Sequence, residues 1–325
     1  MMRKKPPFDW KHNIPVIGIY LVLVFLLIVL SLINPSFFTL SSFTNLFGMA
    51  LPLVFAGMAQ TMVVLVKGID LSVGPTVSLI TVFCASLMGA DGHNMFAVLI
   101  GALLVGIFVG CINGGFVVLG RLQPIIVTLA MTSILTGISL FIMPQPGGTV
   151  PAGLSWLVTE NVGFLPVPLL ALVGLGTIFW LPLRHSSLGQ GLYAIGGNES
   201  GAYYSGVKVK RVTWMAFAAS GLLAAVAGIL LTAQTLSGDP LIGGPFTLNS
   251  IAAVVLGGTS LAGGKGGVIG SVAGALVLSV IVNILFFLGV SAYYQYVFSG
   301  LIVIIALAAV GLGEKLQLGK VWGVK

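Results

Sequence analysis

Long apolar stretches with very few charges constrain this chain more than any other feature. Of its 325 residues, 58% are hydrophobic and 6% are charged, and the mean hydropathy is +1.14. A soluble domain carries about 25% charged residues, so this composition excludes a water-soluble enzyme. A membrane-spanning helix needs about 20 apolar residues, whereas outer-membrane barrels show alternating segments of about ten residues. The unbroken runs therefore predict an all-α, polytopic membrane protein.

Apolar runs separated by polar breaks predict about ten membrane spans. The expected spans are 14–33, 48–66, 71–90, 95–119, 124–143, 164–183, 213–234, 249–262, 267–288 and 291–312. Basic residues gather before the first span, in the loop 184–211 and at the C-terminus. Loops rich in lysine and arginine stay in the cytoplasm. An even number of crossings therefore places both termini and the loop 184–211 on that side, and the Pro- and Gly-rich stretch 144–160 is expected to be an ordered external loop.

An internal similarity links two distant segments. Residues 64–74 line up with residues 254–264 at a fixed offset of 190, and each segment is an apolar run followed by G-x-x-L-x-x-G. Such a relation predicts two related halves, as in many transporters. The span count puts both segments at the cytoplasmic end, so either a span is misassigned or both are broken helices that end inside the membrane; we favour the second. The predicted structural glycines are Gly68, Gly74, Gly258 and Gly264.

Polar side chains within the apolar runs are candidates for a transport path. Asp70 follows a long apolar run, where an ionisable group is by default a functional hypothesis; the alternative is a structural carboxylate near Lys67 at the start of a helix. Neutral amides and hydroxyls suit a neutral polyhydroxylated solute, or else they form hydrogen bonds between helices. The predicted path residues are Asp70, Ser72, Asn113, Gln123, Asn249 and Asn283.

The sequence lacks the usual signals of catalysis, metal binding and nucleotide binding. Cys84 and Cys111 both lie in apolar runs, which indicates neither a disulfide nor a metal pair. The segment around Lys265 fails the phosphate-loop pattern, because Thr259 stands where its first glycine is required and Gly266 follows the lysine. Paired carboxylates, a histidine cluster and a nucleophile–base set are also missing. We therefore expect a non-catalytic protein with no metal and no cofactor of its own.

The polar loop 184–211 contains signals for one short helix. Asn198 is a good N-cap, Glu199 suits a first helical turn and Gly206 suits the position after a helix C-terminus. These signals predict a helix over about 199–205 that exposes Tyr203 and Tyr204. Two exposed tyrosines indicate either a partner surface or contact with lipid headgroups, and the residues alone leave both possibilities open.

Three motifs together resemble the permease subunits of bacterial ribose-type sugar ABC importers. They are GIDLSVG at Gly68–Gly74, YAIGGNESGAYYSGVKVKR at Tyr193–Arg211 and AAVVLGGTSLAGGKGGVIGSVAGAL at Ala252–Leu276. The motifs occur in the order found in that family, and the resemblance covers almost the whole chain. It implies one transmembrane permease domain over 1–325 in the bacterial inner membrane. It also implies that Asp70 shapes a broken helix instead of doing chemistry.

The resemblance further implies the partners of the chain. These are cytoplasmic ABC ATPase subunits that bind the ATP, a periplasmic or surface sugar-binding protein, and a second permease copy or a sibling permease. The coupling segment that would dock into the ATPase comprises Asn198, Glu199, Ala202, Tyr203, Tyr204 and Gly206. The predicted function is translocation of a neutral pentose or hexose. The alternatives are a branched-chain amino-acid ABC permease and a self-sufficient secondary carrier, and the scarcity of charges at membrane depth argues against both.

Overall fold

The computed structural model describes residues 10–291, 293–294, 297–298, 300–301 and 304. The expected span 291–312 lies mostly outside the described residues. The terminal cations Arg3, Lys4, Lys5, Lys315, Lys320 and Lys325 lie wholly outside them.

The described chain is a helical bundle with one minimal hairpin. Its helices are α1 (Trp10–Ile33), η1 (Pro35–Phe38), α2 (Leu40–Leu65), α3 (Val73–Leu87), α4 (Met95–Val118), α5 (Pro124–Ile142), η2 (Ala152–Ser155), α6 (Trp156–Thr159), α7 (Val167–His185), α8 (Ser187–Gly197), α9 (Glu199–Tyr204), α10 (Val209–Thr235), α11 (Gly244–Leu256) and α12 (Val268–Phe287). The strands β1 (Asn161–Val162) and β2 (Leu165–Pro166) pair antiparallel. In the described part of the chain, 7 helices are long and apolar enough to cross a membrane, namely α1, α2, α4, α5, α7, α10 and α12. The protein is thus an all-helical polytopic membrane protein.

Two of the expected spans are shorter than a bilayer. Helix α3 has 15 residues and α11 has 13, which correspond to about 22 and 20 Å at the helical rise, against a hydrocarbon core of about 30 Å. Helix α3 is preceded by the non-helical residues 66–72, here called the first break. Helix α11 is followed by the non-helical residues 257–267, here called the second break. The expected spans 71–90 and 249–262 are therefore only partly helical.

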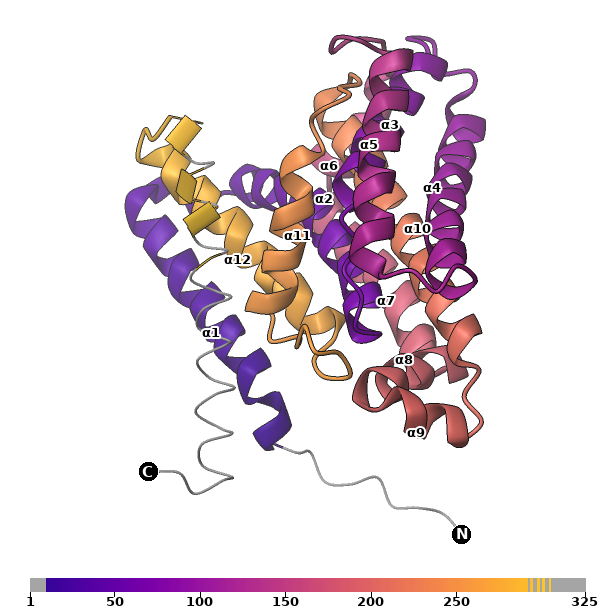
Figure 1. The fold of residues 1–325 in the computed structure, drawn as a ribbon. Coiled ribbons are helices and arrows are strands. Elements are labelled where there is room, and N and C mark those ends of the chain that lie inside the picture. The colour runs from indigo at the N-terminus through magenta and orange to yellow at the C-terminus, as the bar shows by residue number, and fades with distance from the viewer. Residues whose placement is uncertain (1–9, 292, 295–296, 299, 302–303, 305–325) are drawn as a thin grey trace.

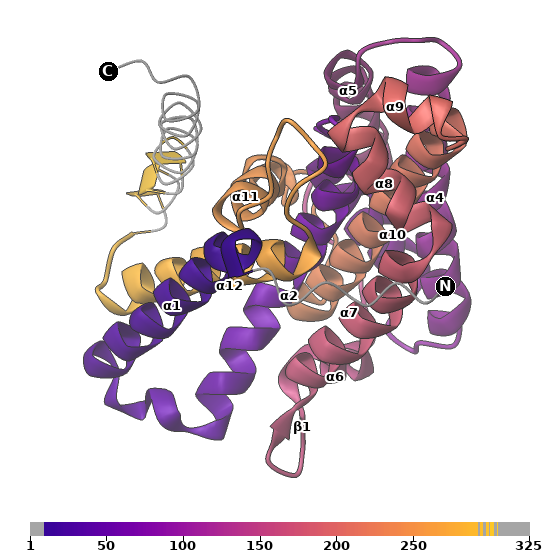
Figure 2. The same cartoon turned by 90° about the horizontal axis from the view of Figure 1, so that it is seen from below.

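Helices α2 and α10 form the centre of the bundle, and α1 lies at its edge. Most of α2 and α10 is buried, whereas α1 is largely exposed and packs mainly on α12. Figure 2 shows α1 and α12 side by side, away from α4 and α5. Helices α4 and α10 pack backbone against backbone, since a Cβ at Gly106 would overlap the carbonyl of Gly221. Small residues therefore allow this close contact between the two helices.

The two ends of the bundle carry opposite charges. One end of the bundle holds α8 and α9 and is here called the α9 end; the opposite end is called the far end (Figure 1). Helices α2, α4 and α11 end at the α9 end, and helices α10 and α12 begin there. The lysines and arginines between residues 16 and 291 lie at the α9 end: Lys67, Arg121, Arg184, Lys208, Lys210, Arg211 and Lys265. The acidic residues Asp91, Glu160 and Asp239 lie at the far end, whereas Glu199 lies on α9 and Asp70 is buried in the first break, so the α9 end keeps a net positive charge.

At the far end, backbone hydrogen bonds join the stretch after α5 to the α10–α11 connection and to the end of α3. Gly147 and Gly238 form an antiparallel bridge, with N–H···O distances of 2.9 and 2.8 Å. Thr149 N donates to Ala85 O at the end of α3 (3.2 Å). The stretch 144–160, which also contains η2 and α6, is therefore ordered, as its composition predicts.

Candidate functional site

The first break begins with a Schellman cap on α2. Lys67 has a positive φ of 65°. Its N–H donates to Val64 O (2.9 Å), and the N–H of Gly68 donates to Val63 O (2.9 Å). This pair of bonds satisfies carbonyls that the end of a helix leaves unpaired, which matters most where lipid replaces water.

The second break begins with the same cap on α11. Gly258 has a positive φ of 78°, its N–H donates to Val255 O (2.9 Å), and Thr259 N donates to Val254 O (3.1 Å). Lys67 thus corresponds to Gly258, one residue away from the pairing that the sequence similarity gives. The backbone conformation is repeated, but the glycine occupies a different position within it.

Asp70 lies at the centre of a buried polar cluster in the first break. Only 2% of the residue is exposed. Its Oδ1 accepts from Ser72 N (2.9 Å) and Ser72 Oγ (2.6 Å), and its Oδ2 accepts from Ser220 Oγ of α10 (3.0 Å). Asn113 of α4 donates from Nδ2 to Ser72 Oγ (2.8 Å). The described residues show no ion pair between Asp70 and Lys67, so neutral donors hold this carboxylate.

The side chain of Gln60 pairs with the backbone of Asp70. In the amide orientation that satisfies both groups, Gln60 donates to Asp70 O (2.9 Å) and accepts from Asp70 N (3.2 Å). Four segments therefore meet at Asp70: α2, the first break, α4 and α10. Every bond named at this cluster stays within the chain, which favours a structural role for Asp70.

The second break is held by close contacts between backbones. A Cβ at Gly257 would overlap the backbone of Gly270 in α12. Gly264 N donates to Leu65 O (3.1 Å), which ties the second break to the end of α2. Gly74 has a similar packing role in α3, where a Cβ would lie 3.0 Å from Thr247 N in α11.

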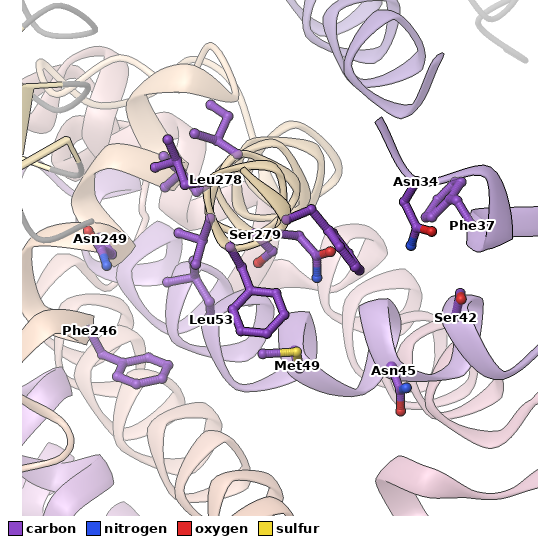
Figure 3. Close-up of a pocket in the computed structure, with 16 residues that line it drawn as sticks. Asn34, Phe37, Ser42, Asn45, Met49, Leu53, Phe246, Asn249, Leu278 and Ser279 are labelled. Atoms are coloured by element: carbon purple, nitrogen blue, oxygen red, sulfur yellow. The ribbon is translucent and has the colours of Figure 1, made fainter. Parts of the chain in front are cut away.

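A pocket of about 440 Å³ opens between η1, α2, α11 and α12 (Figure 3). Its polar lining residues are Asn34, Ser42, Asn45, Asn249, Ser279 and Asn283. The other lining side chains are apolar, among them Phe37, Met49 and Phe246, and none of the described lining residues is charged. Because it is lined by the first half of α2 and the last turns of α12, the pocket lies toward the far end.

Three amides around this pocket have no partner within the described chain. None of the hydrogen bonds between described residues involves the side chains of Asn45, Asn249 or Asn283. Figure 3 shows Asn45 and Asn249 on opposite sides of the pocket. Asn45 is exposed and Asn249 and Asn283 are half-buried, so these groups are available to a polar solute or to water.

The six predicted path residues occupy three places. Asp70, Ser72 and Asn113 belong to the buried cluster, and Asn249 and Asn283 line the pocket. Gln123 is exposed just before α5. The sequence does not single out Asn34, Ser42 and Asn45, because its polar residues between 34 and 47 predict a connection between two spans. In the structure α2 begins at Leu40 instead of 48, with Thr39 Oγ1 accepting from Ser42 N (3.4 Å); an N-cap of this kind was the available signal.

The coupling segment forms the predicted short helix. Asn198 Oδ1 accepts from Gly201 N (3.0 Å) at the start of α9, and Gly206 has a φ of 83° after its end. Tyr203 and Tyr204 are 67% and 86% exposed, and their rings meet edge to face at 5.7 Å. The local cap signals therefore predict this helix correctly.

A second helix, α8, precedes α9 and was not predicted. Ser186 Oγ caps it by accepting from Gly189 N (3.2 Å). Its glycines disfavour helix formation in isolation, yet Gly189 and Gly196 are buried against neighbouring backbone. Tertiary packing thus decides the conformation. Residues 184–211 are mostly helical and not a loop, since α7 extends to His185 and α10 begins at Val209.

Comparisons with known proteins agree with this architecture. Residues 42–307 match the family model described as "Branched-chain amino acid transport system / permease component". The chain is 35% identical over 300 residues to the ribose import permease protein RbsC of Escherichia coli K12, covering 88% of this chain and 91% of the relative. It is 36% identical to RbsC of Bacillus subtilis 168, with 90% and 91% covered. The D-allose transport system permease protein AlsC of Escherichia coli K12 is 34% identical, with 94% of each chain covered.

No solved structure matches the chain. The family model nevertheless covers most of its length, and the relatives align with it nearly from end to end. The chain therefore belongs to the family of membrane-spanning permease components of ABC transport systems.

Proposed function

We propose that this permease moves a neutral sugar of the ribose or allose class through the pocket at the far end. The observation that carries the proposal is the set of unpaired amides on Asn45, Asn249 and Asn283 around an uncharged pocket. Amides that donate and accept without charge match sugar hydroxyls. A family name that mentions branched-chain amino acids suggests another cargo, but the described lining offers no charged side chain to pair with the ammonium group of a zwitterion.

The charge distribution supports an orientation in the bacterial inner membrane. Lysines and arginines at the α9 end, and acidic residues at the far end, favour a cytoplasmic α9 end by the positive-inside rule. Both termini would lie in the cytoplasm if ten spans, arranged as two related halves, are present. The pocket would then open toward the outside, where a sugar-binding protein delivers the solute.

The exposed tyrosines support docking to an ATPase. Tyr203 and Tyr204 project from α9 at the cytoplasmic end of this arrangement, and aromatic side chains are typical anchors of protein interfaces. In this proposal ATP binds and is hydrolysed on the partner ATPase. Two permeases, identical or sibling, form the transport unit, and the single domain 1–325 alternates between outward and inward states.

Uptake by the complete transporter tests the pocket. Asn249→Leu and Asn283→Leu should each lower uptake of labelled ribose or allose about fivefold, because each removes a hydrogen bond to the sugar worth about 1 kcal/mol. Asn94→Ala is the matched control, since Asn94 is exposed outside the pocket. ATPase co-purification should stay normal in all three variants. Normal uptake by both leucine variants, with the transporter assembled, would exclude this pocket as the path.

Docking of α9 is tested separately. Deleting residues 199–205 should abolish ATPase co-purification and transport while the permease still inserts into the membrane. Full recovery of the ATPase with the deleted protein would show that α9 is not the docking element.

A further inference from the structure

Helix α8 ends in direct backbone contact with the second break and with the last residue of α2, which immediately precedes the first break. A Cβ at Gly196 would overlap Gly264 N in the second break and Leu65 O at the end of α2. Those two atoms are themselves hydrogen-bonded (3.1 Å). We call Leu65, Gly196 and Gly264 the backbone junction. No side chain separates its three segments, so the junction has no rotamers with which to absorb a displacement.

Two further contacts fix the second break at this point. Tyr193 of α8 donates from its hydroxyl to Gly266 O (2.9 Å). Burial raises the pKa of the Tyr193 phenol above 10.0, although nearby Arg184 partly offsets the shift, so the hydroxyl remains a donor at neutral pH. The side chain of Lys67 in the first break lies against Gly263 in the second. The two breaks and the end of α8 therefore form one contact region.

Helix α8 is also joined to α9 without a linker. Asn198 ends α8, where its N–H donates to Ala194 O (3.0 Å), and begins α9, where its side chain accepts from Gly201 N (3.0 Å). Ala202 on the inner side of α9 is buried. A displacement of α9 must therefore move the last turn of α8.

We propose that the backbone junction transmits movement of α9 to both breaks at once, with Gly196 as its positioning residue. This inference rests on the proposed docking of α9 to the ATPase. A push on α9 shifts Gly196, which displaces the end of α2 and the second break together because both abut it. The start of α12 then moves relative to α2, and the helices that line the pocket follow.

The test compares two neighbouring glycines in the complete transporter with its ATPase and binding protein. Gly196→Ala inserts a methyl group into the junction, whereas Gly197→Ala adds one where nothing lies within 4 Å. We expect Gly196→Ala to keep the ATPase bound but to lower binding-protein-stimulated ATP hydrolysis and sugar uptake about tenfold, within the range of coupling energies that single residues control. Gly197→Ala should behave like the unaltered protein.

Tyr193→Phe is the second variant, since it removes one hydrogen bond without adding volume. We expect a loss of stimulation of about threefold with unchanged basal hydrolysis. If Gly196→Ala does not assemble, this variant decides: reduced stimulation supports the inference, and full stimulation overturns it. Full stimulation in an assembled Gly196→Ala transporter also overturns it. Failure of α9 docking is recognised independently, because the ATPase would then co-purify with the 199–205 deletion.

Discussion

The two breaks solve the same problem in different ways. Both start from a Schellman cap, after Leu65 and after Leu256. Side chains from three helices then satisfy the first break around Asp70, whereas glycines that let backbones touch hold the second. Non-helical backbone at membrane depth requires protein partners. The comparison shows that either polar side chains or neighbouring backbone can supply them.

The surroundings of each break account for the difference. The first lies between α4 and α10, whose Asn113 and Ser220 point at it from the bundle centre. The second faces the end of α8 at the bundle surface, where Gly264 meets Gly196. We therefore expect substitutions to destabilise the first break when they remove a hydrogen-bonding side chain, and the second break when they add side-chain volume.

The largest effect should follow Asp70→Ala. This change leaves Ser72 N, Ser72 Oγ and Ser220 Oγ without their buried acceptor, and we expect a loss of about 3 kcal/mol in the free energy of unfolding. Titration of the purified protein from mild detergent into SDS measures it. Asp70→Asn keeps the shape and one acceptor oxygen, so it should lose less than half as much. Equal losses would mean that the charge itself stabilises the break.

A smaller effect is expected from Gly258→Ala. An L-residue at a φ of 78° is strained, and the cost should be about 1 kcal/mol in the same titration. Gly137→Ala is the control, because Gly137 lies within α5 with nothing within 4 Å of a new Cβ. An unchanged midpoint for Gly258→Ala would show that the second break relaxes around its cap.

The smallest effect, with opposite sign, is expected from Lys67→Gly. Lys67 occupies the equivalent left-handed position with a φ of 65°. Glycine relieves that strain, which stabilises the folded state, but it also gives the unfolded chain more conformational freedom. We expect the strain relief to be the larger effect, so the free energy of unfolding should rise by about 0.5 kcal/mol. A loss of stability would instead reveal that the contact between the Lys67 side chain and Gly263 supports the second break.

Local signals predicted the local structure well. Asn198 and Gly206 gave the short helix α9 with its exposed tyrosines, and the apolar runs up to residue 288 each contain a helix. The early start of α2 and the whole of α8 were missed, because polar and glycine-rich stretches become helical here through tertiary packing. The sequence similarity between the two breaks pairs Gly68 with Gly258, whereas the structure pairs Lys67 with Gly258. The pairing differs by one residue because the cap requires a positive φ, which Lys67 adopts without being glycine.

The candidate site was less predictable, because it joins residues that are far apart in the chain. Asn249 and Asn283 were singled out by residue type, but only the fold brings them together with Asn45. The partners of Asp70 come from α2, α4 and α10, and no local pattern reports their proximity. That the two breaks derive from related halves stays a prediction.

We expect the bridge between Gly147 and Gly238 to make its side of the far end more rigid than the side formed by α1 and α12. Separating the α10–α11 connection from the stretch after α5 would break the two backbone hydrogen bonds of this bridge. Helix α12 is fastened to α2 near its start, where Thr61 Oγ1 donates to Ser271 Oγ (2.7 Å), while its second half, which includes Asn283, lines the pocket. We therefore expect α12 and α1 to tilt about that point more readily than the bridged segments separate. Because α12 lines the pocket, such a tilt would change the shape of the pocket.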